Sequence, residues 1–165
     1  MTPTGTDPKQ VHGKHDDLTK RIIGVFFEVY NELGSGFLES VHRESMRLAL
    51  GHAGLLAQAE VPVPVRFRGE IVGVFRADLV VNDSVLIELK ACEALAREHE
   101  SQTLNYLRAT AIEVALLMNF GPAPRFKRLV MDNERKNLGP SLGPRSMSSV
   151  PIGVRPFDDT SEGAA

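Results

Sequence analysis

The sequence predicts a mixed α/β fold in which helices flank one central sheet. Apolar residues recur with helical spacing near the amino terminus, and three short segments of strand-like character follow them. A further helix then precedes a continuous apolar run. A helix between two strands favours a parallel pair, because it returns the chain across the sheet. We therefore expect two helices, an antiparallel meander of three strands, a crossover helix, a parallel strand and a short last strand.

Two helices are expected before the sheet. Asp16 or Asp17 can cap the first helix, whose apolar residues follow the 3.6-residue period until a Gly-Ser-Gly run at 34–36 ends it. The second helix is expected at about residues 38–53.

The first predicted strand, residues 61–67, contains Pro62 and Pro64. This suits an edge strand or the entrance of a strand, because proline cannot donate a ladder hydrogen bond. Turns are expected at 68–70 and 82–84. The remaining elements are strands at 71–81 and 85–90, a helix at 94–109, and strands at 113–120 and 126–131.

The chain of 165 residues is long enough for one domain with its own apolar core. We expect this domain at residues 16–132. Residues 1–15 are polar and are expected to form a flexible lead-in. Residues 133–165 are rich in Gly, Pro and Ser and have no apolar period, which predicts a flexible tail.

The single cysteine, Cys92, excludes an intramolecular disulfide and fits a reducing compartment. Its side chain is expected to be a small buried hydrophobe. We expect a cytoplasmic location without membrane contact. The opening residues lack the features of a secretory segment, and the longest apolar stretch, 114–118, is too short to cross a bilayer.

The net charge of −2 argues against binding of nucleic acid through a broad basic surface. Any contact with a polyanion must therefore be local, assisted by a metal, or completed by a second subunit. A homodimer is compatible with this requirement.

The candidate site depends on the register of the second and third strands. Alternation places Leu86, Glu88 and Lys90 on one face of the third strand. A two-residue loop would set Asp78 opposite Ile87, whereas a three-residue loop sets it opposite Glu88. Only the three-residue loop leaves the other face wholly apolar, so we prefer it. The pairs that it creates on that face are Val81 with Val85, Leu79 with Ile87, and Ala77 with Leu89.

Two opposed carboxylates about 4 Å apart would repel by about 4 kcal/mol at an effective dielectric constant near 20. A cation or a proton between Asp78 and Glu88 removes this cost. Oxygen ligands suit Mg²⁺ or Mn²⁺. Lys90 can orient an attacking water or stabilise charge in a phosphoryl transition state. Alternating charges also occur on solvated strand edges, and that interpretation is the more common one for these residues alone.

Two further groups of polar residues lie on helices. His99, Gln102 and Tyr106 are spaced by three and four residues, so they share one stripe that can contact phosphates or bases. An ordinary solvated helix face explains this stripe equally well. Glu39 lies at the start of the second helix, where the helix dipole favours a carboxylate. It can also reach a metal through water.

Five stretches resemble the GxxExxY protein family, which is grouped with the PD-(D/E)XK nuclease superfamily. They follow one another in order within residues 18–131, and the resemblance implies a restriction-endonuclease-like αβββαβ core. The stretches are GFLESVH at 36–42, FRADLVV at 75–81, IELKA at 87–91, HESQTLNYL at 99–107 and LLMNFG at 116–121.

The resemblance implies that Asp78 and Glu88 bind a metal, with the Leu89 carbonyl as a third ligand. It also implies a catalytic role for Lys90 and a supporting role for Glu39.

Gln102 and Tyr106 match the Gln-x-x-x-Tyr motif of one nuclease branch, where these residues help to hold the substrate. The sequence departs from the family at one position, because His42 replaces the motif tyrosine.

The resulting expectation is a nuclease, a hydrolase that uses Mg²⁺ or Mn²⁺ to activate water against a phosphodiester of nucleic acid, DNA in the first place. The alternative is a catalytically inactive module that binds nucleic acid or protein on the same fold. The neutral charge balance and the small size favour that alternative.

Overall fold

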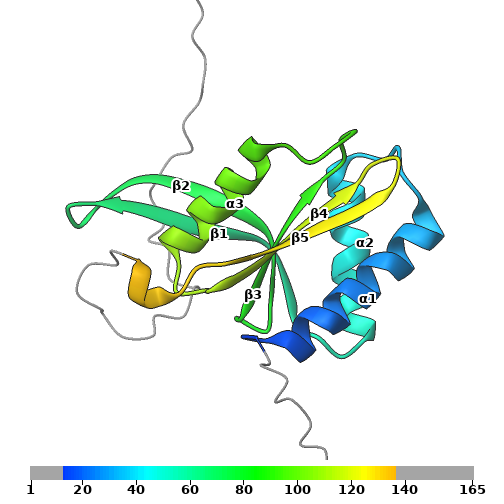
Figure 1. Cartoon of the computed structure of the whole chain (residues 1–165), viewed down its shortest axis with the longest axis horizontal. Coiled ribbons are helices and arrows are strands. Elements are labelled where there is room, and N and C mark those ends of the chain that lie inside the picture. Colours follow the sequence, from blue (N-terminus) through cyan, green and yellow to red (C-terminus); the bar gives the residue numbers. More distant parts are fainter. Residues whose placement is uncertain (1–12, 137–165) are drawn as a thin grey trace, which may run out of the picture.

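The computed structural model describes residues 13–136, which form one five-stranded sheet with helices on both faces (Figure 1). The predicted mixed α/β class is therefore confirmed. The elements in chain order are α1 (Asp16–Leu33), α2 (Glu39–His52), β1 (Ala57–Phe67), β2 (Glu70–Val81), β3 (Val85–Lys90), α3 (Arg97–Ala109), β4 (Val114–Phe120), β5 (Pro124–Val130) and the 3₁₀ helix η1 (Asn133–Arg135).

The strands follow one another across the sheet in the order β1-β2-β3-β4-β5. Only β3 and β4 are parallel, and α3 connects them, as the sequence predicts. β1 is an edge strand and contains both prolines of the predicted edge. It begins at Ala57, four residues earlier than expected, because its pairing with β2 continues to the far end of that strand.

The register of β2 against β3 is the one that a three-residue turn produces. Leu79 lies opposite Ile87, and the pairs continue to the turn at residues 82–84. Pairing stops at Leu79, however, so the expected pair of Ala77 with Leu89 does not form. The side chain of Ala77 instead packs on the α3 side of the sheet. The strand changes face at Asp78, which is absent from the β1–β2 ladder together with its neighbour Glu60, whose φ is 52°.

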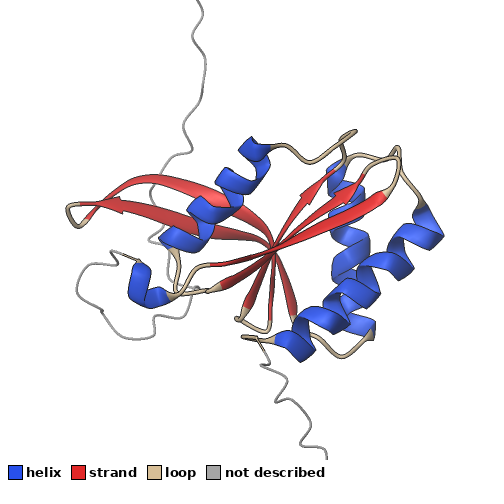
Figure 2. Ribbon diagram, viewed as in Figure 1, coloured by secondary structure: helices blue, strands red, loops and turns tan. Residues whose placement is uncertain are grey.

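The two faces of the sheet bury separate apolar clusters. α1 and α2 cover one face and α3 covers the other, as Figure 2 shows with helices on both sides of the strands. The first cluster, here called the α1/α2 core, contains Ile22, Phe26, Met46, Leu79, Ile87, Leu89 and Phe120 among its buried residues. The second, the α3 core, includes Val61, Val63, Ala77, Val80, Leu86, Tyr106 and Leu107. Within residues 13–136, no helix has the length and apolar character needed to cross a membrane.

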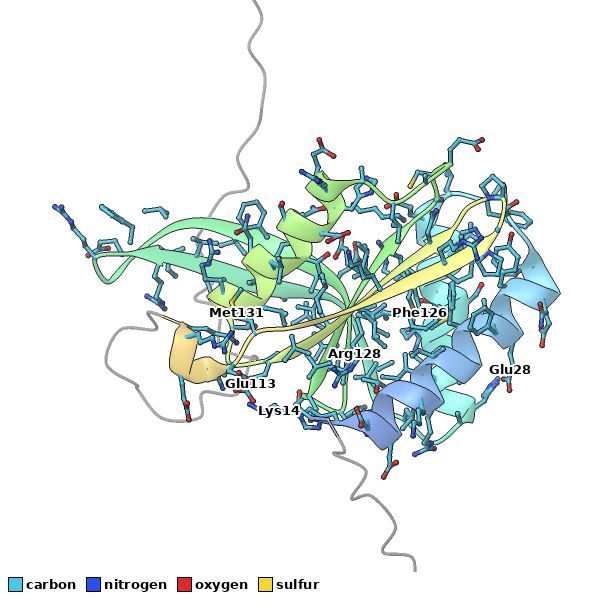
Figure 3. All side chains as sticks on the ribbon, viewed as in Figure 1. Lys14, Glu28, Glu113, Phe126, Arg128 and Met131 are labelled. Carbon is cyan, nitrogen blue, oxygen red and sulfur yellow. The ribbon has the colours of Figure 1, made fainter. Side chains whose placement is uncertain are left out.

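Polar contacts tie both ends of the described chain to the sheet. Figure 3 shows Lys14 beside Glu113, and their charged groups are 3.0 Å apart. The buried Lys136 donates a hydrogen bond to the Thr110 carbonyl at 3.0 Å. Residues 133–136, which the sequence assigns to the tail, thus pack against the domain. The remainder of the predicted lead-in and tail lies outside the described residues.

Candidate active site

The candidate site lies where β2, β3 and α3 meet. Asp78 comes from the point at which β2 changes face, and Glu88 and Lys90 come from the α3 side of β3. Gln102 and Tyr106 come from the middle of α3. The structure brings these five side chains together from three successive elements of the chain.

The Asp78 carboxylate is fixed by two contacts. Its Oδ2 accepts a hydrogen bond of 2.8 Å from the backbone N–H of Leu89, and its Oδ1 accepts one of 3.2 Å from Arg43. The β2–β3 ladder has already ended at this point, so the carboxylate takes the place of a main-chain acceptor. The hydrogen bond from Leu89 therefore fixes both the Asp78 carboxylate and the end of β3.

Glu88 is a buried carboxylate with an unsatisfied oxygen. Only 5% of the residue is exposed, and Oε2 has no hydrogen-bond partner within the described part of the chain. The other oxygen lies 3.7 Å from the Lys90 ammonium. Burial, together with the negative charge of Asp78, raises the pKa of Glu88 to about 8, and Lys90 opposes both effects. Such a carboxylate is stabilised by a proton or a cation.

A chain of hydrogen bonds holds Lys90 in place. Its ammonium donates to Gln102 Oε1 at 3.0 Å, and Gln102 Nε2 donates to the Tyr106 hydroxyl oxygen at 3.1 Å. Tyr106 is 5% exposed, and burial, together with the charge of Glu88, raises its phenol pKa. Its hydroxyl is therefore neutral and keeps a proton. Two of the three residues of the predicted helical stripe, Gln102 and Tyr106, thus connect to the sheet through this network.

Arg43 is a site residue that sequence reasoning missed. Its guanidinium lies 3.2 Å from Asp78 and 3.5 Å from Glu60, and its side chain is largely buried. The available signal is its spacing of four residues from Glu39, which places both on one stripe of α2. No pattern in the sequence indicates that this stripe meets the turning point of β2.

Two predicted site residues do not join the network. Glu39 is exposed at the first residue of α2 and makes no hydrogen bond or ion pair with any residue from 13 to 136. His99 is half-buried, and its Nδ1 accepts a hydrogen bond of 3.0 Å from the backbone N–H of Ala96. This bond closes the first turn of α3, which is a structural reason for the residue.

His42, which stands where the GxxExxY motif has tyrosine, lies on the α1/α2 side of the molecule. It is fully buried, and its ring stacks on Phe120 with 4.0 Å between the ring centroids. Neither ring nitrogen has a hydrogen-bond partner in the described chain. Burial lowers the pKa of His42. The residue packs as a neutral aromatic ring and does not contact the carboxylates.

The segment that follows β3 is held by Asn119 on β4. The Asn119 side chain accepts a hydrogen bond from the Cys92 N–H at 3.0 Å and donates one to the Cys92 carbonyl at 2.9 Å. A Cβ at Gly121 would collide with this same carbonyl. Cys92 itself is only half-buried, with its thiol 3.2 Å from the Ala94 carbonyl, so the expectation of a buried hydrophobe was wrong. These contacts fix the strand end that presents Lys90.

The donor set fits a hard divalent cation. Asp78 and Glu88 supply carboxylate oxygens, and Glu88 Oε2 is buried without a partner in the described chain. Among residues 13–136 no group of three or more His, Cys, Asp or Glu side chains is arranged to hold a metal. A cation here would therefore rely on two carboxylates, with backbone carbonyl and water oxygens completing its coordination, as is common for Mg²⁺.

The family of the chain follows from a match over most of its length. The model of the PD-(D/E)XK nuclease superfamily matches residues 16–129, which include every element from α1 to β4 and nearly all of β5. The chain belongs to this superfamily. No curated protein matches the chain.

One solved structure that resembles the chain is "Crystal structure of SSO0001". It shares 18% sequence identity and a TM-score of 0.46 with this chain. The likeness covers 72% of this chain and 60% of that one, so the chain spans about three fifths of the solved protein's length.

Proposed function

We propose that this protein is a nuclease that hydrolyses phosphodiester bonds of DNA with the help of Mg²⁺ or Mn²⁺. One observation carries the proposal: the buried Glu88 has an oxygen without a partner in the described chain and lies beside Asp78. The superfamily of nucleases to which the chain belongs supplies the reaction class. We further propose that the chain is a GxxExxY member of that superfamily, on the five stretches quoted above.

Asp78, Glu88 and the Leu89 carbonyl would hold the cation. When bound, a divalent cation lowers the pKa of a coordinated water and neutralises charge on the phosphate. The Asp78 carboxylate is already oriented by the Leu89 N–H. Glu88 Oε2 offers a lone pair that no other group in the described chain uses.

Lys90 is the proposed charge stabiliser. Its ammonium is held by Gln102 on the same face as Glu88, so its position is set before substrate binds. A fixed cation beside a phosphodiester stabilises the negative charge that grows on the phosphate oxygens in the transition state. Gln102 and Tyr106 orient Lys90 and lie next to the path of the substrate strand.

Three other residues take secondary roles in this proposal. Arg43 balances the charge of Asp78 and holds the carboxylate in place. Glu39, one turn before Arg43 on α2, would contact a metal-bound water, and His99 would contact the substrate backbone near the start of α3. In a homodimer, two charge-balanced protomers would enclose the nucleic acid together.

A catalytically inactive binding module has less support. Such a module gains nothing from burying a carboxylate with a free oxygen beside a second carboxylate, because the arrangement costs stability in the absence of a cation.

Cleavage assays with plasmid, single-stranded DNA and RNA test the proposal, each with Mg²⁺, Mn²⁺ or EDTA. We expect cleavage that requires a divalent cation and is abolished in Asp78→Ala. Mn²⁺ should raise the melting temperature of the wild type and leave that of Glu88→Gln unchanged, since the cation binds only the folded site.

Glu44→Gln is the matched control, because Glu44 is an exposed carboxylate of α2 that pairs with Arg47 away from the site. It should cleave like the wild type. Absence of cleavage with every cation, or cleavage that persists in Asp78→Ala, would remove the proposed reaction.

A further inference from the structure

An open groove runs along the outer side of the candidate site, between β2 and α3. Its volume is about 480 Å³, which lies in the range of small-ligand pockets, roughly 300–1,000 Å³. Phe75 forms the strand side of the groove, and Arg97, Asn105 and Tyr106 line its helix side. Figure 1 shows the β1–β2 hairpin extending past α3, so the groove lies between this arm and the helix.

The groove shares two residues with the candidate site. Gln102 and Tyr106 line it, and the same two residues hold Lys90 through the hydrogen-bond chain. A molecule in the groove therefore contacts the residues that position the Lys90 ammonium.

The groove has an exposed aromatic ring. Phe75 is 52% exposed, although it lies next to the buried Tyr106 with 6.0 Å between the ring centroids. The contact with Tyr106 supports the ring from one side and leaves much of its surface in solvent. A supported aromatic ring of this kind is a stacking platform for a nucleic-acid base.

The groove also has a positive charge that the fold does not use. Arg97 is exposed at the first residue of α3 and has no hydrogen bond or ion pair with the rest of the described chain. A basic residue in the first turn opposes the helix dipole, so helix stability does not explain it. Glu98 lines the groove too, but it forms no ion pair with Arg97 within residues 13–136, so the Arg97 guanidinium stays available to an anion. Arg97 is suited to a phosphate.

We propose that this groove binds one unpaired nucleotide of the DNA strand, with its base stacked on Phe75 and its phosphate near Arg97. This inference rests on the proposed function and names its substrate class. Inside a duplex both faces of each base are covered by neighbouring pairs, so the Phe75 ring on the strand side of the groove can stack on an unpaired base or a strand end but not on an interior base pair. The protein therefore prefers a single strand or an open strand end to intact duplex DNA.

Binding of a short single-stranded DNA that carries one 2-aminopurine tests the inference, with the full chain and EDTA present. Stacking on Phe75 should quench or shift the fluorescence of the 2-aminopurine. Phe75→Leu keeps an apolar side chain but removes the aromatic face, and it should weaken binding roughly fivefold to hundredfold. Phe75→Trp should retain the binding of the wild type.

Phe67→Ala is the matched control, because Phe67 is an exposed phenylalanine of the same hairpin that does not line the groove. It should change binding by less than about twofold, within the range of an ordinary surface substitution. A duplex of the same sequence should bind more weakly and should not respond to Phe75→Leu. Absence of single-strand binding, equal effects of Phe75→Leu and Phe67→Ala, or equal loss for duplex and single strand would overturn the inference.

The two proposals fail separately in this experiment, because EDTA removes hydrolysis from it. Binding that depends on Phe75 in a chain that never cleaves DNA supports the stacking groove and removes the proposed reaction. Cleavage without any dependence of binding on Phe75 supports the reaction and removes the groove.

Discussion

The two faces of β3 differ in chemistry although alternating residues of one six-residue strand make both of them. Toward α1 and α2, Ile87 and Leu89 are fully buried in an apolar core. Toward α3, the apolar Leu86 is followed by the buried Glu88 and the half-buried Lys90, which lie beside polar groups of α3. Packing alone satisfies the first face, whereas the second contains charge that needs a partner.

The contrast shows how a small fold can hold a site whose buried charge lowers stability. The α1/α2 core fixes the position of the strand, so the side chains on its opposite face need little reorganisation to meet a ligand. Substitutions on the two faces should therefore act on different quantities: stability on the apolar face and chemistry on the polar one.

The largest effect is expected from Glu88→Gln, which removes a carboxylate ligand with almost no change in shape. Loss of a metal ligand costs several kcal/mol of transition-state stabilisation, so cleavage should fall by about 10³-fold. The free energy of unfolding should change by no more than about 1 kcal/mol, because a carboxyl with a pKa of about 8 is mostly protonated in the metal-free protein at neutral pH, and glutamine has the same shape and charge. Cleavage rates and urea denaturation measure the two quantities. A large loss of stability with an unchanged cleavage rate per folded molecule would mean that Glu88 serves stability and not catalysis.

The next effect is expected from Ile87→Ala, one residue away on the other face. A cavity in the α1/α2 core should lower the free energy of unfolding by about 2–5 kcal/mol. Below the melting transition, cleavage per folded molecule should stay within a few-fold of wild type. Chemical denaturation with Ile87→Val as the graded control, expected to cost about 0.5–1.5 kcal/mol, measures the loss. A decrease of less than about 0.5 kcal/mol for the alanine variant would show that the packing is looser than the burial of Ile87 indicates.

The smallest effect concerns His42, the buried ring in the apolar half of the molecule. Burial lowers its pKa in the fold, while the unfolded chain titrates near 6.5. Below pH 6.5 the unfolded state binds a proton more readily than the folded state does, so wild-type stability should fall by at most about 1 kcal/mol between pH 6.5 and 5.5. In His42→Phe this component of the pH dependence should be absent, because phenylalanine fills the stack on Phe120 without titrating.

Urea denaturation at several pH values measures this difference. His52→Gln is the control, since His52 is exposed at the last residue of α2 and should leave the slope unchanged. Identical slopes for the wild type and His42→Phe would mean that the His42 imidazole accepts its proton inside the fold.

The sequence predicted the central part of the fold from particular residues. Alternation in β3 and the three-residue turn at 82–84 identified the register of Leu79 with Ile87, because a slip of one residue would have placed polar side chains in the α1/α2 core. Pro62 and Pro64 identified β1 as an edge. The sequence also grouped Gln102 with Tyr106 by helical spacing, and the two are hydrogen-bonded.

Other features depend on the tertiary structure, because they are contacts between separate strands and helices that no residue spacing within one element indicates. The sequence analysis missed the change of face at Asp78. This change coincides with the break in the β1–β2 ladder at Glu60, and the residue pattern of neither strand indicates it. The sequence placed His99 with Gln102, but in the structure the His99 ring accepts a hydrogen bond from the backbone N–H of Ala96 instead.

By itself, then, the sequence determined the fold class, the order of helices and strands along the chain and the face on which Glu88 and Lys90 lie, because short-range periodicity encodes each of these. Only the tertiary structure decided that Arg43 reaches Asp78, that one oxygen of Glu88 is left without a partner in the described chain, and that Phe75 borders a groove beside Tyr106. Those contacts depend on how α2 and α3 dock on a twisted sheet, which is set by the packing of whole elements rather than by the spacing of residues along the chain.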